Sequence, residues 1–179
     1  MPSRRGLLTF PLALAVAGCA AAPARPVTAG SAAPARPATT GSAAPVPETL
    51  RFSGTTLDGA PYDAAQLAGK PAVLWFWAPW CATCASEAQS VADFQEEYAG
   101  RLTFLGVAGM GTTKAMHQFV ADLGVGAVTH LNDPDLTIWA KFGIAQQSVY
   151  VLLDAAGAIV KRGYLDDLQL TGELTKLVS

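Results

Sequence analysis

The chain has 179 residues, of which 51% are hydrophobic and 15% are charged, a composition that excludes a fully disordered protein. Lys and Arg together number 12 against 14 Asp and Glu, and the formal charge of −2 lacks the positive excess that nucleic-acid binding requires. We therefore expect no nucleic-acid partner. Arginines but no acidic residues occur within positions 1–47, whereas the rest of the chain is acidic, so two physically different segments are joined.

The N-terminal segment is typical of an exported protein. Arg4 and Arg5 precede an apolar stretch over residues 6–17, which is shorter than the ~20 residues that a membrane-spanning helix needs. Residues 16–19, Val-Ala-Gly-Cys, resemble the bacterial lipobox, which implies that Cys19 is acylated and begins the mature protein. We predict a lipoprotein signal peptide over residues 1–19 and an extracytoplasmic protein held at the cell membrane by lipid on Cys19. Ordinary cleavage near residues 20–22, which would discard Cys19, is the alternative.

An Ala- and Pro-rich repeat follows the predicted signal peptide. Residues 21–31 and 32–42 repeat one unit of small residues, Pro and a single Arg. Such a segment has no large apolar side chains whose burial could offset the entropy lost on ordering the backbone. We predict a disordered linker over residues 20–47 and one folded domain over residues 48–179.

The domain begins with short β elements and a strongly apolar strand. We expect a strand over residues 50–53 and a turn over residues 57–61. Residues 72–77, Ala-Val-Leu-Trp-Phe-Trp, are apolar on both faces, which is typical of a strand buried on both sides of a sheet. Apolar residues then recur at helical spacing over residues 81–98, so a strand, a turn and a helix follow one another.

Strands and helices keep alternating toward the C-terminal end. The further predicted elements are a strand over 102–107, a helix over about 113–123, a strand over 128–131, a helix over about 135–142, hairpin strands over 149–153 and 158–162, and a helix over 166–178. The alternation predicts parallel strands joined by helices. The fold class is therefore α/β, with a hairpin at one edge of the sheet.

Two of the three cysteines lie where the buried strand passes into the helix. At a helix start, unpaired N–H groups and the macrodipole favour negative charge, so Cys81 should ionise more readily than a free thiol. Cys84 lies on the same face one turn inside the helix, within reach for a disulfide. We predict Cys81 as the attacking thiol and Cys84 as the resolving thiol of a thiol–disulfide exchange.

Two other uses of this cysteine pair compete with catalysis. A disulfide across so short a loop stabilises by only ~2 kcal/mol in the chain-entropy model, against ~4–5 kcal/mol for a long loop, so a purely structural crosslink is disfavoured. A Cys-x-x-Cys pair can also supply two thiolates to zinc or copper. The imidazoles, His117 and His130, are each isolated in the sequence. We expect no metal site and no cofactor, with a non-catalytic metal-binding protein as the alternative.

Residues 76–84, Phe-Trp-Ala-Pro-Trp-Cys-Ala-Thr-Cys, resemble the active-site segment of the thioredoxin superfamily. Residues 48–179 are similar to its extracytoplasmic TlpA/ResA and DsbE-like branch, and most similar to actinobacterial secreted DsbE/DsbF-type proteins. The resemblance implies a thioredoxin-like fold: a central mixed sheet flanked by helices, a strand–helix unit inserted at about residues 102–131, and a C-terminal hairpin plus helix. It also implies a thiol–disulfide oxidoreductase whose partners are cysteine-containing exported proteins or a redox partner protein.

Three residues near the cysteines bear on this resemblance. Trp75 stands where thioredoxin has a buried Asp, which implies that this proton acceptor is absent. Glu87 matches the Glu of the branch's Cys-x-x-Cys-x-x-Glu pattern, and either tunes local acid–base behaviour or is an exposed carboxylate favoured by the helix dipole. Ser148 stands in place of the superfamily's cis-proline. Because a cis bond before a non-proline residue costs ~2.5–4 kcal/mol, we expect a trans bond and an altered loop.

The resemblance also locates a substrate surface. Trp80, beside the attacking thiol, and Ser148, in the loop that presents backbone to substrate in this family, are the expected substrate-binding residues. Trp75, Trp77 and Trp139 are expected in the core. The oxidising outer compartment and the missing buried acid favour disulfide formation over reduction of the ResA/TlpA type, which is the alternative.

Overall fold

The computed structural model describes residues 45–179, so the predicted signal peptide, Cys19 and most of the predicted linker lie outside the described residues. The helices (α, and η for 3₁₀) and strands in chain order are η1 (Glu48–Leu50), β1 (Ser53–Thr56), β2 (Pro61–Asp63), η2 (Ala64–Leu67), β3 (Ala72–Trp77), α1 (Ala82–Glu97), β4 (Thr103–Ala108), α2 (Thr113–Asp122), β5 (Thr129–Asn132), α3 (Thr137–Lys141), β6 (Val149–Leu153), β7 (Ile159–Gly163) and α4 (Asp167–Leu177). Within residues 45–179, no helix combines the length and apolar character needed to cross a membrane.

The strands form one mixed sheet in the order β2-β1-β5-β4-β3-β6-β7. Strand β3 pairs in parallel with β4, β4 pairs in parallel with β5, and the other pairings are antiparallel. All six residues of β3 are buried, as the run of apolar side chains predicts. The central strand is therefore shielded on both faces, and its carboxyl end leads directly into α1.

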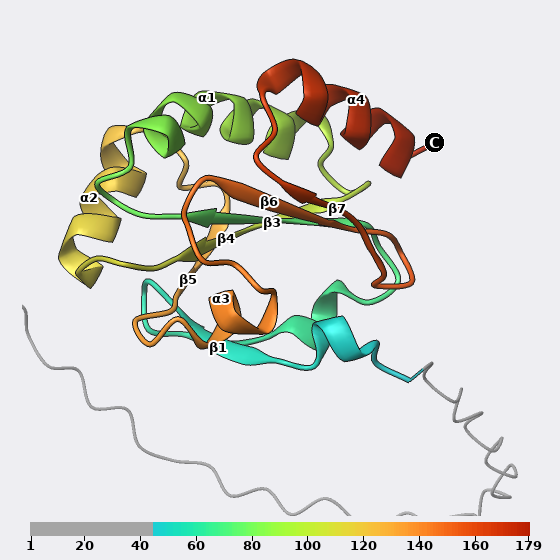
Figure 1. Ribbon diagram of the computed structural model, residues 1–179, viewed down its shortest axis with the longest axis horizontal. Helices are drawn as coiled ribbons and strands as arrows, with labels where there is room; N and C mark the ends of the chain where they lie inside the picture. The colour runs from blue at the N-terminus through green and yellow to red at the C-terminus, as the bar shows by residue number, and fades with distance from the viewer. Residues whose placement is uncertain (1–44) are drawn as a thin grey trace, which may run out of the picture. The chain divides into compact units, whose positions relative to one another are not determined.

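Side chains alternate across β3 and divide the core between the two faces of the sheet. Trp75 and Trp77 pack with residues of α1, α2 and α4, whereas Leu74 and Phe76 pack with residues of η1, η2 and α3. Figure 1 shows α1 and α4 together on one side of the sheet and α3 on the other. The predicted core positions of the three tryptophans, Trp139 included, are confirmed.

The described chain enters the domain at the end of the sheet opposite the cysteines. In the antiparallel β3–β6 pair, Phe76 lies opposite Val149, and Ala72 lies opposite Leu153, so the β6–β7 turn lies at the amino end of β3. Thr49 donates its hydroxyl to the carbonyl oxygen of Gly157 in that turn. The first described residues are therefore attached far from the carboxyl end of β3.

The observed elements differ from the sequence predictions in several places, and β2, η1 and η2 were not predicted. The predicted strand over residues 50–53 is wrong except at Ser53, because Leu50 closes a 3₁₀ turn with the Pro47 carbonyl and β1 begins at Ser53. Helix α3 is shorter than predicted, because the buried Asp133 carboxylate accepts the N–H groups of Thr137, Ile138 and Trp139 and starts the helix there.

Candidate active site

Cys81 and Cys84 form a disulfide at the start of α1. Cys81 is the N-cap residue, in extended conformation, and its Sγ accepts the backbone N–H of Cys84 at 3.0 Å. Cys84 has no exposed surface, whereas Cys81 keeps a small exposed fraction of 5%. The sequence-predicted pair is therefore brought together, with Cys81 as the sulfur that a partner can reach.

The local chain explains why the pair forms here. The N–H of Cys81 donates to the Ala78 carbonyl oxygen at 3.1 Å, which closes a turn between β3 and α1. Helix α1 thus directs the N–H of Cys84 at the sulfur of its own N-cap residue, where a side-chain oxygen usually accepts it. A negative sulfur at this position is stabilised by those groups and by the helix dipole.

Trp80 forms an exposed apolar surface beside Cys81, as predicted. Its side chain is 59% exposed, and its indole N–H donates to the Met110 carbonyl oxygen at 2.7 Å. Met110 is itself exposed and adopts a left-handed backbone conformation with φ 57°. In the same loop, a Cβ added to Gly111 would collide with the Pro79 ring, so the loop after β4 approaches the cysteine segment closely.

Ser148 lies next to the carboxyl end of β3. Its backbone N–H donates to the Phe76 carbonyl oxygen at 2.9 Å, and its φ of 62° is left-handed. The described residues contain no cis peptide bond, so the bond before Ser148 is trans as expected, and an altered loop stays a prediction. Its side chain is 7% exposed, and the hydroxyl donates inward to Glu87 Oε1 at 2.6 Å. Substrate contact at Ser148 stays a prediction.

Glu87 is a buried carboxylate one turn after Cys84 on α1. Its exposed fraction is 6%, so the alternative of an exposed carboxylate is wrong. Oε1 accepts from Ser148, and Oε2 accepts from Trp75 Nε1 at 2.9 Å. Burial raises the pKa of Glu87, the hydrogen bonds from Ser148 and Trp75 and the nearby Tyr150 hydroxyl partly oppose this, and the charge of Asp167 adds to it.

The site therefore contains a buried acid in spite of Trp75. It occupies the position where thioredoxin has Asp, but its indole N–H binds a carboxylate that arrives from the helix. The signal in the sequence was the spacing of Glu87 from Cys84, since residues three apart lie on one helix face. The expectation of a missing buried carboxylate is corrected.

The sequence and the fold both match known proteins. The Redoxin family pattern matches residues 29–176 of the chain. The chain belongs to the Redoxin family. The thioredoxin-like α/β fold expected from residues 76–84 is confirmed, as is the resemblance to the actinobacterial DsbE/DsbF-type branch of this family.

Several similar proteins are mycobacterial. Soluble secreted antigen MPT53 of Mycobacterium tuberculosis is 44% identical over 110 residues, which cover 62% of this chain and 62% of MPT53. A structure of Mycobacterium DsbF in mixed oxidised and reduced forms matches with a TM-score of 0.70 and 43% identity, over 74% of this chain and 99% of that chain. A secreted Mycobacterium tuberculosis disulfide oxidoreductase homologous to E. coli DsbE matches with a TM-score of 0.67 and 38% identity, over 73% and 98%. The matched segment spans less than two thirds of MPT53.

A second buried titratable group of this Redoxin-family protein lies near Trp77. His130 is 5% exposed, accepts the Trp77 indole N–H on Nδ1 at 3.2 Å, and donates from Nε2 to the Val125 carbonyl oxygen at 3.0 Å. Burial lowers its pKa to about 4, partly opposed by the bond to Val125. Both ring nitrogens of His130 are therefore already in hydrogen bonds.

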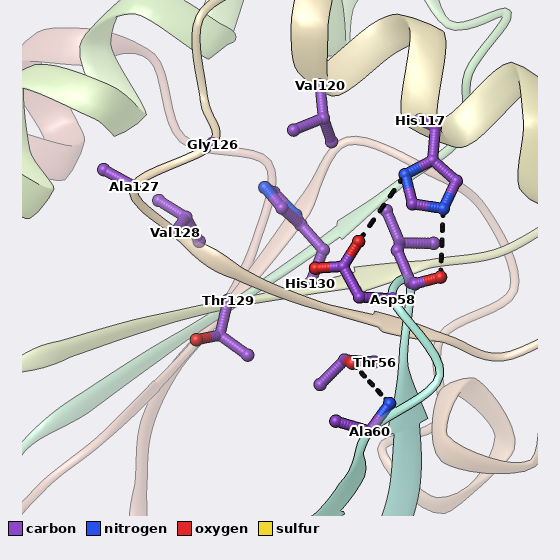
Figure 2. A pocket seen from close by; sticks show the side chains of 11 residues that line it. Thr56, Asp58, Ala60, His117, Val120, Gly126, Ala127, Val128, Thr129 and His130 are labelled. Atoms are coloured by element: carbon purple, nitrogen blue, oxygen red, sulfur yellow. Dashed lines mark hydrogen bonds and ion pairs between the residues drawn. The ribbon is translucent and has the colours of Figure 1, made fainter. Parts of the chain in front are cut away.

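A hollow near this histidine contains neither cysteine (Figure 2). At its rim, His117 Nε2 donates to the Leu57 carbonyl oxygen at 3.0 Å, and its Nδ1 lies 4.0 Å from Asp58 Oδ1. Over the described residues 45–179, no group of three or more His, Cys, Asp or Glu side chains is arranged to hold a metal ion.

Proposed function

We propose that this protein is an extracytoplasmic thiol–disulfide oxidoreductase that acts on cysteines of exported proteins through Cys81 and Cys84. The observation that carries the proposal is the position of Cys81 as the N-cap of α1, bonded to Cys84 and accepting its N–H. The similarity to a secreted disulfide oxidoreductase supports the same chemistry. Trp80 supplies an apolar surface beside Cys81 for the substrate chain.

The exchange begins at the sulfur that is reachable from solvent. A substrate thiolate attacks Cys81 Sγ, the Cys81–Cys84 bond breaks, and Cys84 leaves as a thiolate that takes up a proton. A second substrate thiolate attacks the substrate sulfur of the mixed disulfide and releases Cys81 as a thiolate. The substrate gains one disulfide and loses two electrons, which the cysteine pair gains. An oxidised redox partner then restores the pair.

The proposed direction is disulfide formation. The oxidising outer compartment supports it, as does the likeness to DsbE/DsbF-type proteins. Trp75 does not favour either direction, because Glu87 supplies a buried carboxylate. Reduction of the ResA/TlpA type is the second candidate, and it is favoured by that same carboxylate, which can accept the proton that Cys84 loses when it attacks a mixed disulfide.

Two measurements on the full chain separate these directions. The first is the Cys81–Cys84 reduction potential by equilibration with glutathione, and the second is the rate at which the oxidised protein forms disulfides in a reduced, unfolded substrate protein. We expect a potential well above the ~−270 mV of thioredoxin and faster substrate oxidation. A potential near ~−270 mV without substrate oxidation would instead support the reductase.

We also propose that Cys19 carries lipid and that residues 20–47 tether the domain to the membrane. The pattern of residues 16–19 and the Pro-rich repeat support this, both outside the described residues. Cys19→Ser should move the protein from the membrane fraction to the soluble fraction. An unchanged distribution would contradict lipidation.

A further inference from the structure

The Glu87 carboxylate is held from two sides by neutral hydrogen-bond donors. The Ser148 hydroxyl reaches Oε1 at 2.6 Å from the loop before β6, and the Trp75 indole reaches Oε2 at 2.9 Å from β3. Among the described residues, Glu87 forms no ion pair. Three elements of the fold therefore meet at one buried group beside the cysteines, without a compensating cation.

The two donors differ in what they can do when the carboxylate takes up a proton. An indole N–H only donates, so Oε2 must remain an acceptor as long as Trp75 stays in place. A hydroxyl both donates and accepts, so it can rotate to receive a proton from the oxygen that it faces. The proton of a neutral Glu87 therefore belongs on Oε1, the oxygen next to Ser148.

We propose that Ser148 is a positioning residue for Glu87: its hydroxyl donates to Oε1 while the carboxylate is ionised, and accepts from Oε1 when the carboxyl is protonated. Ser148 thereby keeps both protonation states hydrogen-bonded in a buried environment, where an unpaired polar atom is costly. The residue that stands in place of the family's cis-proline thus acquires a role in proton handling through its side chain.

Other titratable groups face Glu87 and define the controls. Tyr150 of β6 faces the carboxylate from the sheet, and Asp167 at the start of α4 adds a negative charge from the covering helix. On α1 itself, Cys84 lies one turn earlier and is held in the disulfide. Tyr150 does not make either of the two short side-chain bonds to Glu87, at 2.6 and 2.9 Å. Tyr150→Phe is therefore a matched loss of one nearby hydroxyl.

The use of this proton in turnover rests on the proposed function, because Cys84 must gain or lose a proton whenever the pair changes redox state. The hydrogen-bond arrangement itself does not depend on turnover. A titration of Glu87 in the oxidised protein, in which neither cysteine titrates, therefore tests Ser148 separately from catalysis.

The experiment is an NMR titration of the full-length oxidised chain labelled with carboxyl-¹³C glutamate, with Glu87→Gln identifying the Glu87 signal. Ser148→Ala removes the hydroxyl. Ser148→Gly also removes it but suits the left-handed backbone, so agreement between the two variants separates the hydroxyl from backbone strain. Because a hydrogen bond to a charged group favours the ionised form, we expect both variants to raise the Glu87 midpoint by roughly one to two pH units, and Tyr150→Phe to raise it less.

Three results would overturn the proposal. The first is an unchanged Glu87 midpoint in folded Ser148→Ala and Ser148→Gly. The second is a shift that is present in Ser148→Ala but absent in Ser148→Gly, which would assign the effect to the backbone. The third is a larger shift in Tyr150→Phe than in either variant.

A kinetic measurement then links the result to the proposed function. In the parent background, Ser148→Ala should move the pH dependence of Cys84 attack on a mixed disulfide upward by the same amount as the Glu87 midpoint. In a Glu87→Gln background, Ser148→Ala should cause no such shift. If the titration shift is found without any exchange activity, the Ser148 proposal stands and the oxidoreductase proposal fails.

Discussion

Trp75 and Trp77 lie two residues apart on one face of β3, and each donates its indole N–H to a buried titratable side chain. Trp75 donates to Glu87 at 2.9 Å, and Trp77 donates to His130 at 3.2 Å. Burial favours the neutral form of both groups, because it raises the pKa of Glu87 and lowers the pKa of His130 to about 4. One strand thus supports two buried groups of opposite charge type.

The two pairs differ in the partner on the other side of the titratable group. The second nitrogen of His130 donates to the Val125 carbonyl oxygen, which can only accept, so the ring is fixed in one neutral tautomer. The second oxygen of Glu87 faces the Ser148 hydroxyl, which can donate or accept. Burial therefore produces a structural histidine at one position and a carboxylate suited to proton transfer beside the cysteines at the other.

The largest expected effect lies at the cysteines, and Glu87 is the group of the two that lies one helical turn from Cys84. Cys81→Ser should abolish disulfide exchange, because it removes the sulfur that the substrate attacks. With a disulfide substrate, Cys84→Ser should instead accumulate a mixed disulfide, because the Cys81 thiolate attacks and no resolving thiol remains. Mass spectrometry of trapped complexes distinguishes the two variants. Accumulation on Cys84 in Cys81→Ser would reverse the assigned roles.

The next largest effect should separate the two titratable groups. Glu87→Gln should slow exchange at neutral pH by roughly 10²-fold, because general acid–base groups contribute at least that much when they act on a proton that moves in the reaction. His130→Gln is the matched control and should change the rate only slightly. Stopped-flow tryptophan fluorescence with a disulfide peptide measures both rates. Equal rates in the two variants would remove the distinction between the groups.

His130 should instead affect stability, in a defined pH range. Its folded pKa of about 4 lies below the ordinary value of 6.5, so its neutral form contributes stability above pH 6.5 that is lost as the pH falls toward 4. The parent should lose about 3 kcal/mol more than His130→Gln over this range. Urea unfolding at several pH values gives the difference. Parallel pH curves for the two proteins would contradict this assignment.

The smallest effect is expected at the tryptophans. Trp75→Phe and Trp77→Phe each remove one indole N–H from a buried acceptor, which should cost about 1–3 kcal/mol of unfolding free energy. Only Trp75→Phe should also raise the pKa of Glu87 further, because it removes a bond to the ionised form. Chemical unfolding together with the Glu87 titration measures both effects. A Glu87 shift in Trp77→Phe as large as that in Trp75→Phe would mean that the two networks are coupled.

Much of the fold could be predicted from local patterns. The six apolar residues of β3, the helical periodicity after Cys81 and the hairpin around residues 154–157 each depend on neighbours in the sequence. The cysteine pair could be placed for the same reason, since the strand-to-helix turn and the spacing of Cys84 are local.

The polar network of the site could be predicted only in part. Spacing places Glu87 one turn from Cys84, but it does not show whether that face is buried, because the covering groups come from other elements. The Ser148–Glu87 bond joins residues 61 positions apart, and the left-handed backbone of Ser148 directs the hydroxyl inward. Such long-range contacts depend on the assembled sheet, which residue-type patterns do not specify.

The most direct test of the proposed function is the pH dependence of alkylation of the fully reduced full-length chain, read separately for Cys81 and Cys84 by peptide mass spectrometry. We predict that Cys81 reacts with a midpoint clearly below the ~8.5 of a free thiol, while buried Cys84 reacts far more slowly at every pH. Equal reactivity of the two thiols, each with a midpoint near ~8.5, would contradict a thiolate held at the start of α1.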